Sequence, residues 1–406
     1  MKTIIYKLKR IWHFARSGLL GGYLGELRYH HPQRKLKIIA ITGTDGKTTT
    51  STMVYHLLKT AGFKVGLIST VAAYINEEVL DTGFHVTSNS PGDLYRYMDM
   101  MVKKGLEYLV LETTSHGAYQ YRTWGIRPII AGLTNIDREH LDYHLSWENY
   151  LAAKLLILRP ADSVVLNEDQ DSFNTVKKAL AGKRLLTFGK EKRFGAATEK
   201  AIRSSFNDEF NRLNAAMAIT IVKDLGVNEK NIVKALQTFT LPAGRMEFIP
   251  NQLGAQIIVD FAHTPQALEN ALKSIRKNYA KGKKMIAVFG CAGLRDGSKR
   301  APMGKIASEL ADTAIFTAED PRTENIWTII NQMKSDLGDH HNKVISIPDR
   351  REAVLYALKN FAHDGNVIAV FGKGHEQSMC YGTTEHLWND ITAIKGMLKN
   401  ELKKSH

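Results

Sequence analysis

A glycine-rich loop near the start of the chain combines backbone N–H groups, a lysine and hydroxyl groups at a spacing suited to phosphate. The stretch Gly43-Thr44-Asp45-Gly46-Lys47-Thr48-Thr49 follows an apolar segment and opens a segment of helical pattern. Glycines let backbone N–H groups close around phosphate oxygens, and the N-terminus of a helix adds its dipole. Lys47 would bring a positive charge to the outer phosphates, and the Thr48 hydroxyl can bind magnesium. Although Gly-x-x-Gly-Lys-Thr is shorter than the usual Walker loop, the order of strand, loop and helix predicts a nucleotide site rather than a structural turn.

Alternating strand and helix patterns surround this loop. Before residue 241 the sequence predicts strands at 36–42, 65–69, 108–112, 129–134 and 163–166, and helices at 48–60, 146–159 and 214–225. This alternation is typical of a parallel α/β sheet. Leu241-Pro242-Ala243-Gly244 is typical of a boundary. Beyond it the sequence predicts strands at 257–261, 285–289, 314–317, 344–347 and 367–371, helices at 266–279, 303–311, 326–334 and 351–361, and a C-terminal helix.

We therefore predict an α/β protein of three parts. These are an amphipathic arm (1–36), a central P-loop ATPase domain with a mostly parallel sheet (37–241) and a Rossmann-like C-terminal domain (242–406).

The arm is strongly basic. Residues 1–37 hold nine Lys or Arg and one acid, Glu26, and so contribute +8 of the formal net charge of +14. Bases alternate with apolar side chains at helical spacing, interrupted at Gly18 and at Gly21-Gly22. Two interpretations stand side by side: a helix packed on the body of the protein, and an interfacial helix on an anionic membrane. Because the rest of the chain is close to balanced, the charge is no evidence for nucleic-acid binding.

Composition excludes several classes of protein. Hydrophobic residues make up 44% and charged residues 24% of the 406 residues, which argues against wholesale disorder. Two cysteines cannot build a disulfide framework, so we expect a reducing compartment. No apolar run approaches the ~20 residues that cross a bilayer, and the N-terminus lacks the pattern of a signal peptide. We expect a cytoplasmic protein, with the arm as its candidate contact with a membrane.

Several motifs, in order along the chain, resemble those of the Mur ligase family. The family's loop reads Gly-Thr-x-Gly-Lys-Thr-Thr, as residues 43–49 do. Further matches lie at 111–116 (LETTSH), 134–142 (TNIDREHLD), 150–154 (YLAAK), 210–215 (FNRLNA), 244–247 (GRME) and 260–265 (DFAHTP). The resemblance covers roughly residues 36–400. It implies a central ATP-binding domain and a C-terminal ligase domain, which activate a carboxylate as an acyl phosphate and join it to an amino acid.

The resemblance also assigns residues to the phosphates and the metal. A ligase that phosphorylates a carboxylate must neutralise the triphosphate and the developing acyl phosphate, usually with two magnesium ions. Glu112, His140 and Lys154 would act with Lys47 in catalysis, and the first three would hold magnesium with Thr48. Lys154 would be carbamylated, which turns its amine into an anionic oxygen ligand. From residue types alone, each of these side chains is more often solvated or structural, and only the ordered set of motifs favours the catalytic interpretation.

Four more residues would contact ATP by the same resemblance. Asn214 would do so from the central domain, and Arg245 and His263 from the C-terminal domain. Asp349 would hold the ribose, and it also fits the cap of the helix that follows it.

Three C-terminal stretches resemble the branch of the family that adds a diamino acid to a muramoyl-L-alanyl-D-glutamate acceptor in peptidoglycan precursor synthesis. They are residues 289–304, 319–324 and 372–377. The family's amino-acid pocket then falls on Arg295, Asp320, Arg322, Gly372 and Glu376.

Asp320 leaves the diamino acid open. The diaminopimelate-adding pattern has Asn at this position, and an anion there favours the bare ammonium of lysine. Arg322 still suits the distal carboxylate of meso-diaminopimelate, because the planar guanidinium forms two parallel hydrogen bonds. Asp320 can also pair with Arg322 without touching substrate. Lysine and meso-diaminopimelate therefore both remain.

The acceptor side is less complete. Thr87 and Ser88 match the family's pattern in part, whereas Ser115, Gln120 and Arg122 match it better and would hold the peptide or the sugar-phosphate. The family places a domain that grips the UDP-sugar before the phosphate loop, and forty-two residues precede Gly43 here. A UDP-linked and a lipid-linked acceptor therefore both remain open.

Two other functions compete with this one. The first is another ligase of the superfamily, resembling folylpolyglutamate synthase or the ligase half of cyanophycin synthetase, and the C-terminal stretches argue against it. The second is a non-catalytic nucleotide-binding protein at the membrane, and the retained catalytic residues argue against that. We expect ATP and Mg²⁺ as cofactors, small molecules (a peptidoglycan precursor and an amino acid) as partners, no nucleic acid, and a monomer.

Overall fold

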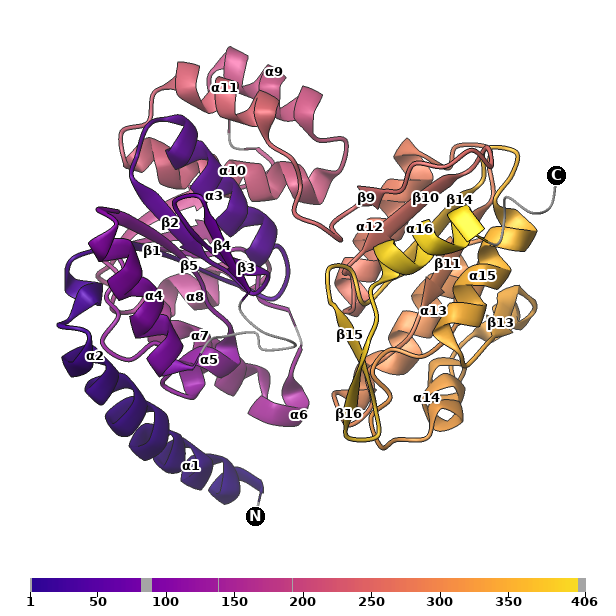
Figure 1. The fold of residues 1–406 in the computed structure, drawn as a ribbon, viewed down its shortest axis with the longest axis horizontal. Coiled ribbons are helices and arrows are strands. Elements are labelled where there is room, and N and C mark those ends of the chain that lie inside the picture. Colours follow the sequence, from indigo (N-terminus) through magenta and orange to yellow (C-terminus); the bar gives the residue numbers. More distant parts are fainter. Residues whose placement is uncertain (1, 82–89, 138, 192, 401–406) are drawn as a thin grey trace. The chain divides into compact units, whose positions relative to one another are not determined.

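The chain folds as two compact units, Met1–Thr240 and Leu241–His406 (Figure 1). The structure, a computed structural model, describes residues 2–81, 90–137, 139–191 and 193–400. Each unit has its own sheet and its own packed helices. The mixed α/β class predicted from the sequence is confirmed.

An eight-stranded sheet forms the centre of the first unit. Its strands are β1 (Lys37–Thr42), β2 (Val65–Ile68), β3 (Ala72–Ile75), β4 (Glu78–Asp81), β5 (Tyr108–Glu112), β6 (Ile130–Leu133), β7 (Ser163–Asn167) and β8 (Arg184–Phe188). Their order is β4-β3-β2-β5-β1-β6-β7-β8. From β2 to β8 in this order the strands pair in parallel, and β3 and β4 add an antiparallel edge. Because β5, β1 and β6 are parallel neighbours, the loops that follow them leave the sheet at one edge.

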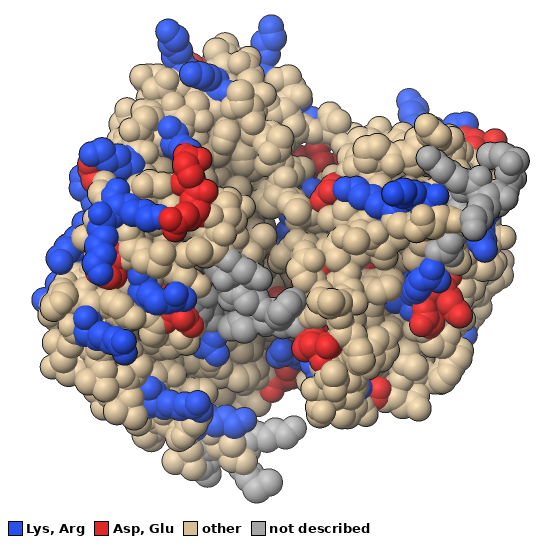
Figure 2. Space-filling view, in the orientation of Figure 1, with Lys and Arg blue, Asp and Glu red and all other residues tan. Residues whose placement is uncertain are grey.

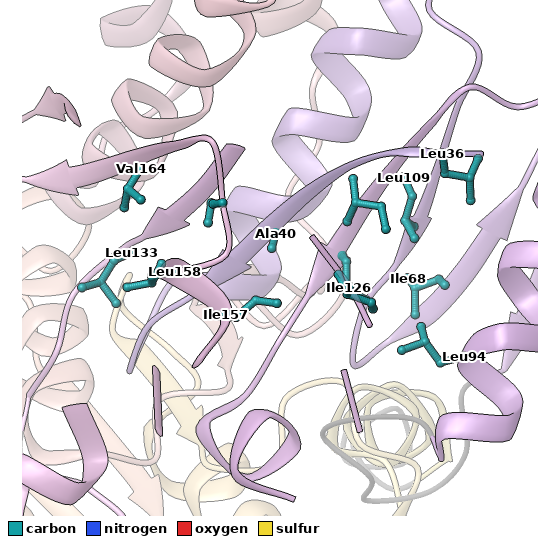
Figure 3. Close-up of a cluster of buried hydrophobic side chains, with 14 of the residues drawn as sticks. Leu36, Ala40, Ile68, Leu94, Leu109, Ile126, Leu133, Ile157, Leu158 and Val164 are labelled. Carbon is teal, nitrogen blue, oxygen red and sulfur yellow. The ribbon is translucent and has the colours of Figure 1, made fainter. Parts of the chain in front are cut away.

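Helices cover both faces of this sheet. The helices of this unit are α3 (Lys47–Thr60), α4 (Pro91–Lys103), α5 (Ser115–Tyr119), α6 (Leu141–His144), α7 (Trp147–Leu158), α8 (Phe173–Ala179), α9 (Ala196–Ser205), α10 (Glu209–Asp224) and α11 (Glu229–Thr238), of which α9 and α11 pack on each other. Leu94 of α4 and Leu158 of α7 share a buried cluster with Ala40 and Leu109 of the strands (Figure 3). α3 and α10 pack together on the opposite face. Burial on both faces explains why the central strands are almost continuously apolar.

The second unit is built on a six-stranded sheet with the order β13-β12-β11-β14-β10-β9. Its strands are β9 (Glu247–Phe248), β10 (Gln256–Asp260), β11 (Met285–Phe289), β12 (Thr313–Phe316), β13 (Val344–Ser346) and β14 (Val367–Phe371), with a separate hairpin of β15 (Ser378–Tyr381) and β16 (Thr384–Leu387). Its helices are α12 (Pro265–Asn278), α13 (Arg300–Leu310), α14 (Ile326–Met333), α15 (Arg350–Phe361) and α16 (Asp390–Asn400), with short 3₁₀ turns η3 (Gly297–Lys299) and η4 (Gly338–Lys343). All pairs except β9–β10 in this sheet are parallel. Side chains of α15 and α16 join alternate residues of β10, β11 and β14 in one core.

Most predicted elements occur, and three strands, at 108–112, 285–289 and 367–371, have the predicted bounds. The sequence pattern did not reveal β3, β4, β8, the β15–β16 hairpin, α4, α8, α9 or α11. Edge strands and half-exposed helices carry weak periodicity, because only part of their surface faces a core. α10 begins at Glu209, five residues before the predicted start at Asn214.

The arm packs on the rest of the first unit, and its residues 2–28 form an unbroken helical run that a turn at 29–31 ends. It consists of α1 (Lys2–His13), a wider π-type segment η1 (Phe14–Tyr23), α2 (Leu24–Arg28) and a 3₁₀ turn η2 (Pro32–Arg34). The predicted interruption at Gly18 and Gly21-Gly22 is wrong, because these residues are helical and the arm lies close to the body there. A Cβ atom at Gly22 would lie 2.5 Å from Cβ of Trp124. Within the described residues no helix is both long and apolar enough to span a bilayer.

Candidate active site

The phosphate loop connects β1 to α3 in the predicted way. Gly43 has φ +154°, and a Cβ there would lie 1.8 Å from the Thr134 hydroxyl oxygen. Gly46, at φ +78°, lies against the Asn214 amide, where a Cβ would come within 2.4 Å of Oδ1. Only glycine fits both positions. Because glycine has no side chain, the loop backbone can lie close to its neighbours, as a loop that holds phosphate requires.

An asparagine after β6 holds the loop in place. Oδ1 of Asn135 accepts hydrogen bonds from the backbone N–H groups of Thr44 at 3.0 Å and Asp45 at 2.9 Å. The Lys47 ammonium donates to the carbonyl of Thr44 at 2.6 Å, so its positive charge lies over the loop. Thr49 is buried in the first turn of α3. The loop is thus organised by the protein itself.

Thr48 and Glu112 form an oxygen-rich pair beside this loop. The Thr48 hydroxyl donates to Oε1 of Glu112 at 3.0 Å, and the backbone N–H of Thr70 donates to Oε2 at 3.1 Å. Both side chains are buried. Mg²⁺ in nucleotide sites usually takes one or two carboxylates together with phosphate oxygens and water. This pair fits such an ion.

Lys154 lies beneath the loop with its amine at the backbone of the first glycine. Its side chain is 1% exposed, and Nζ donates to the carbonyl of Gly43 at 2.6 Å. Burial and the nearby charge of Lys47 lower its pKa well below the ordinary value, against the opposing effect of Glu139, Asp45 and Asp137. Burial and the neighbouring positive charge therefore favour the neutral form of the Lys154 amine.

His140 lies in a cluster of aromatic and imidazole rings. Its imidazole lies 4.6 Å from that of His116 and 6.2 Å from the Tyr150 ring, measured between centroids. Its Nε2 is 3.5 Å from a carboxylate oxygen of Glu139. In the part of the chain that the structure describes, no three His, Cys, Asp or Glu side chains are grouped as metal ligands would be. Of the ligands expected from the resemblance, Thr48 and Glu112 contact each other directly.

The acceptor-side residues meet the arm through a buried histidine. The Ser115 hydroxyl lies 3.1 Å from Nε2 of His144, whose Nδ1 lies 3.2 Å from the hydroxyl of Tyr6 in α1. Burial, with the charges of His116 and Lys154, lowers the pKa of His144 to about 3, so this ring is neutral. Gln120 donates to the Tyr143 hydroxyl at 2.9 Å.

Arg122, Thr87 and Ser88 were also predicted on the acceptor side. Burial lowers the pKa of the Arg122 guanidinium, and Tyr143 opposes that effect. The predicted residues Thr87 and Ser88 lie outside the described residues.

The predicted nucleotide ligands divide between the two units. In the first, the Asn214 carbonyl accepts from the Thr50 hydroxyl at 3.3 Å and lies against Gly46. In the second, Nδ1 of His263 lies 2.9 Å from the carbonyl of Phe261, and the Arg245 guanidinium lies 4.5 Å from the centre of the Phe261 ring. Asp349 accepts from the backbone N–H of Glu352 at 2.8 Å and so caps α15.

In the second unit a buried lysine gathers two of the predicted amino-acid ligands. Lys373 is fully buried, and its ammonium lies 2.8 Å from Oδ1 of Asp320 and 2.6 Å from Oε2 of Glu376. Burial works against its charge, but these two carboxylates outweigh burial and raise its pKa. Arg322 donates to the carbonyl of Gly293 at 2.8 Å, and its guanidinium is 3.8 Å from Asp320.

Backbone conformation around this lysine is also unusual. Asp320 has φ +41° and Arg322 φ +53°, in the left-handed region that costs a non-glycine residue energy. Gly372 has φ +104° and lies against Glu319, a buried carboxyl whose pKa is raised by desolvation to about 7. Arg295 is exposed. Such strain is typical of functional sites, since surrounding structure must enforce it.

Sequence reasoning missed several residues that organise these sites. Asn135 and Tyr150 stand inside quoted motifs but were given no role, although a polar side chain directly after a central strand is a usable signal. Lys373 lies between the chosen Gly372 and Glu376. Tyr6 and His144 carried no signal, because nothing in their spacing reveals that the arm contacts α6.

Comparison with known proteins agrees with these motifs. Residues 41–232 match the Mur ligase middle domain, and residues 244–374 match the Mur ligase glutamate ligase domain. A relative from Clostridium botulinum named UDP-N-acetylmuramoyl-L-alanyl-D-glutamate–2,6-diaminopimelate ligase is 36% identical over 371 residues, covering 86% of this chain and 75% of the relative.

Two solved structures are similar as well. A structure of UDP-N-acetylmuramoyl-L-alanyl-D-glutamate–2,6-diaminopimelate ligase matches 94% of this chain and 83% of its own, with 26% identity and a TM-score of 0.60. The folylpolyglutamate synthase of Thermotoga maritima covers 98% of both chains with a TM-score of 0.64, but at 18% identity it shows the fold alone. By its domains and its relatives, this chain belongs to the Mur ligase family of ATP-dependent amide ligases.

Proposed function

We propose that this chain joins 2,6-diaminopimelate to a UDP-N-acetylmuramoyl-L-alanyl-D-glutamate acceptor in peptidoglycan precursor synthesis, with conversion of ATP to ADP and phosphate. The observation that carries the proposal is the buried Lys154 amine at the carbonyl of Gly43, directly beneath a phosphate loop. Relatives at 32–36% identity carry this activity in their names.

The reaction has two steps. A carboxylate oxygen of the acceptor attacks the γ-phosphorus of ATP, the bond to the β-phosphate oxygen breaks, and ADP leaves. The amine of the diamino acid then attacks the acyl carbon, phosphate leaves, and the amine loses a proton. Lys47 and the loop N–H groups hold the phosphates in line, and they stabilise charge that spreads over the phosphoryl oxygens.

Lys154 would act as a carbamate in these steps. Its neutral amine attacks the carbon of CO₂, an N–C bond forms, and a proton passes to water, which leaves an anionic oxygen pair at the end of the side chain. Thr48, Glu112 and this carbamate are the groups that would hold Mg²⁺, with His140 as a further candidate. When bound, Mg²⁺ would neutralise charge on the phosphates.

The second unit would select the amino acid. Arg322, held by the carbonyl of Gly293, can bind a carboxylate of the incoming substrate with its remaining N–H groups. Lys373 offsets the charge of Asp320, which weakens the argument that Asp320 favours lysine. These contacts support 2,6-diaminopimelate, and lysine is the competing substrate.

Phosphate release measured across acceptors and amino acids tests this function. With ATP, Mg²⁺ and the UDP-linked acceptor, we expect release to require 2,6-diaminopimelate and the product mass to equal acceptor plus diamino acid minus water. Glutamate with a folate acceptor is the control for the folylpolyglutamate alternative. Release with that control pair alone, or with no acceptor dependence, would contradict the proposal.

A further inference from the structure

The arm presents two different faces over residues 5–28. The inner face is made by Tyr6, His13, Gly18, Gly22 and Gly25, which lie against the first unit. The Tyr6 ring stacks on that of Tyr119 at 4.6 Å between centroids, and its carbonyl accepts from the Tyr119 hydroxyl at 2.6 Å. These contacts hold the arm against the body, so its other face has a defined direction.

The outer face is apolar to an unusual degree. Of the seventeen exposed large hydrophobic side chains in the described residues, ten belong to the arm. They are Ile5, Leu8, Ile11, Trp12, Phe14, Leu19, Leu20, Tyr23, Leu24 and Leu27, and of these Phe14 also contacts the rings of Tyr121 and Trp124 in the body. Many recur three or four positions apart, which places them along one side of a helical run. Exposed apolar side chains gathered on one segment in this way are typical of an interaction site.

Basic side chains lie among these apolar ones. Lys9, Arg16 and Arg28 are exposed in the same segment, whereas Arg10, also exposed, donates to the Tyr121 hydroxyl of the body at 3.2 Å. The single acid, Glu26, is buried and accepts from Arg34 at 2.8 Å, so its charge is compensated inside the arm. Figure 2 shows Lys and Arg side chains spread among uncharged ones along the lower edge of the first unit, where the arm lies. The outer face is therefore both apolar and positive.

We propose that this outer face docks on an anionic lipid bilayer, with the arm lying in the plane of the interface. Apolar side chains would enter the boundary between headgroups and acyl chains, and the bases would contact lipid phosphates. A second copy of the chain fits less well, because two such faces would bring like charges together. The long aliphatic side chains also suit lipid better than the stacked bases of nucleic acid.

Docking would place the acceptor-side residues near the membrane. The same helix that carries the outer face carries Tyr6, which contacts His144, which contacts Ser115. One helix thickness therefore separates the lipid-facing side chains from the residues expected to hold the acceptor. The docking itself does not depend on the proposed reaction, since it can be measured without substrate.

Vesicle co-sedimentation of the full chain tests the proposal. We expect the protein to pellet with vesicles of phosphatidylglycerol and phosphatidylcholine, to remain largely in solution with phosphatidylcholine alone, and to bind more weakly as salt rises. Replacing Ile11 and Leu20, which are 65% and 63% exposed, with serine should weaken partitioning at least tenfold. Lys9→Gln with Arg28→Gln should weaken it about fivefold for each base removed.

Val79→Ser is the matched control. Val79 is 61% exposed in β4, outside the arm, so its replacement should leave partitioning unchanged. Because every altered side chain is exposed, circular dichroism and melting should match the wild type. Equal partitioning of the wild type and the Ile11/Leu20 variant would overturn the proposal. The proposal would also be overturned if the wild type did not bind vesicles but formed a concentration-dependent dimer, and if the Ile11/Leu20 variant no longer formed that dimer.

Discussion

Lys154 in the first unit and Lys373 in the second are equally buried but electrostatically opposite. Lys154 is 1% exposed and donates to a neutral carbonyl, and its pKa falls. Lys373 is 0% exposed and lies within 2.8 Å of two carboxylates, and its pKa rises. Partners, rather than burial, thus decide which lysine keeps its proton. We infer that one lysine is poised for covalent chemistry with CO₂ and the other is an ionic anchor.

Removing the reactive lysine should have the largest effect. We expect Lys154→Ala to lower the rate of phosphate release by roughly a thousandfold, because a group that helps to hold Mg²⁺ at the phosphates contributes several kcal/mol to the transition state. Bicarbonate with a short-chain carboxylic acid should restore part of the rate by filling the cavity with a carboxylate. An alanine variant with near-normal turnover would remove Lys154 from the mechanism.

The two lysines should differ in their contribution to folding. Lys373→Met leaves the Asp320 and Glu376 carboxylates without their shared cation, and we expect the free energy of unfolding to fall by about 3–5 kcal/mol. At about pH 10, where the proton-linked effect described below is smallest, Lys154→Met removes one hydrogen bond to a carbonyl, and we expect a loss of about 1–2 kcal/mol. Urea unfolding monitored separately for each unit measures both. Equal losses would show that the two ammonium groups have similar environments.

The pH dependence of the free energy of unfolding should also differ between the two lysines. An unfolded lysine binds a proton below the ordinary pKa of 10.5. Folded Lys154 binds its proton only at lower pH, because burial and the charge of Lys47 lower its pKa. The wild type should therefore lose stability relative to Lys154→Met as pH falls from 10.5, by up to ~1.4 kcal/mol per unit.

Lys373 provides the contrast in the same experiment. Its raised pKa means that its contribution is fully present below 10.5 and is lost only as pH rises through the folded value. The difference between wild type and Lys373→Met should therefore stay flat between about pH 7 and about pH 10. Carbonate-free buffer keeps Lys154 uncarbamylated. If the stability difference between the wild type and Lys373→Met changed with pH in this window, it would contradict the raised pKa of Lys373.

The smallest effect is expected for the choice between lysine and meso-diaminopimelate in the Asp320→Asn variant. Oδ1 of Asp320 already accepts from Lys373 and from the backbone N–H of Cys380 at 2.9 Å. We therefore expect Asp320→Asn to change the ratio of kcat/KM for lysine and meso-diaminopimelate by less than about fivefold, which is less than ~1 kcal/mol. Competition between the two substrates measures this ratio directly, and a change of a hundredfold would show that Asp320 reads the distal group.

Much of the scaffold could be predicted from local patterns. The order of strand, Gly-Lys-Thr loop and helix at residues 36–60 was sufficient to place the loop on α3, because glycine geometry and apolar runs are local properties. The branch of the family was predicted in the same way, from motifs that follow strands.

Contacts between distant segments could not be predicted. Spacing alone did not predict the burial of Lys154, since its partner Gly43 is 111 residues away and reaches it only through the order of the strands. Lys373 was passed over because its importance comes from Asp320, which is 53 residues away. The arm's glycines were interpreted as breaks, although Gly22 permits contact with Trp124. In each case the deciding partner is remote in sequence.

Detection of the carbamate tests the central claim most directly. After equilibration with ¹³C-bicarbonate, nuclear magnetic resonance of the full chain should show one protected carbamate carbon. That resonance should be absent from Lys154→Met and present in Lys373→Met, because only the neutral amine reacts with CO₂. A spectrum with no such resonance in the wild type, or one in which it survives in Lys154→Met, would contradict the account.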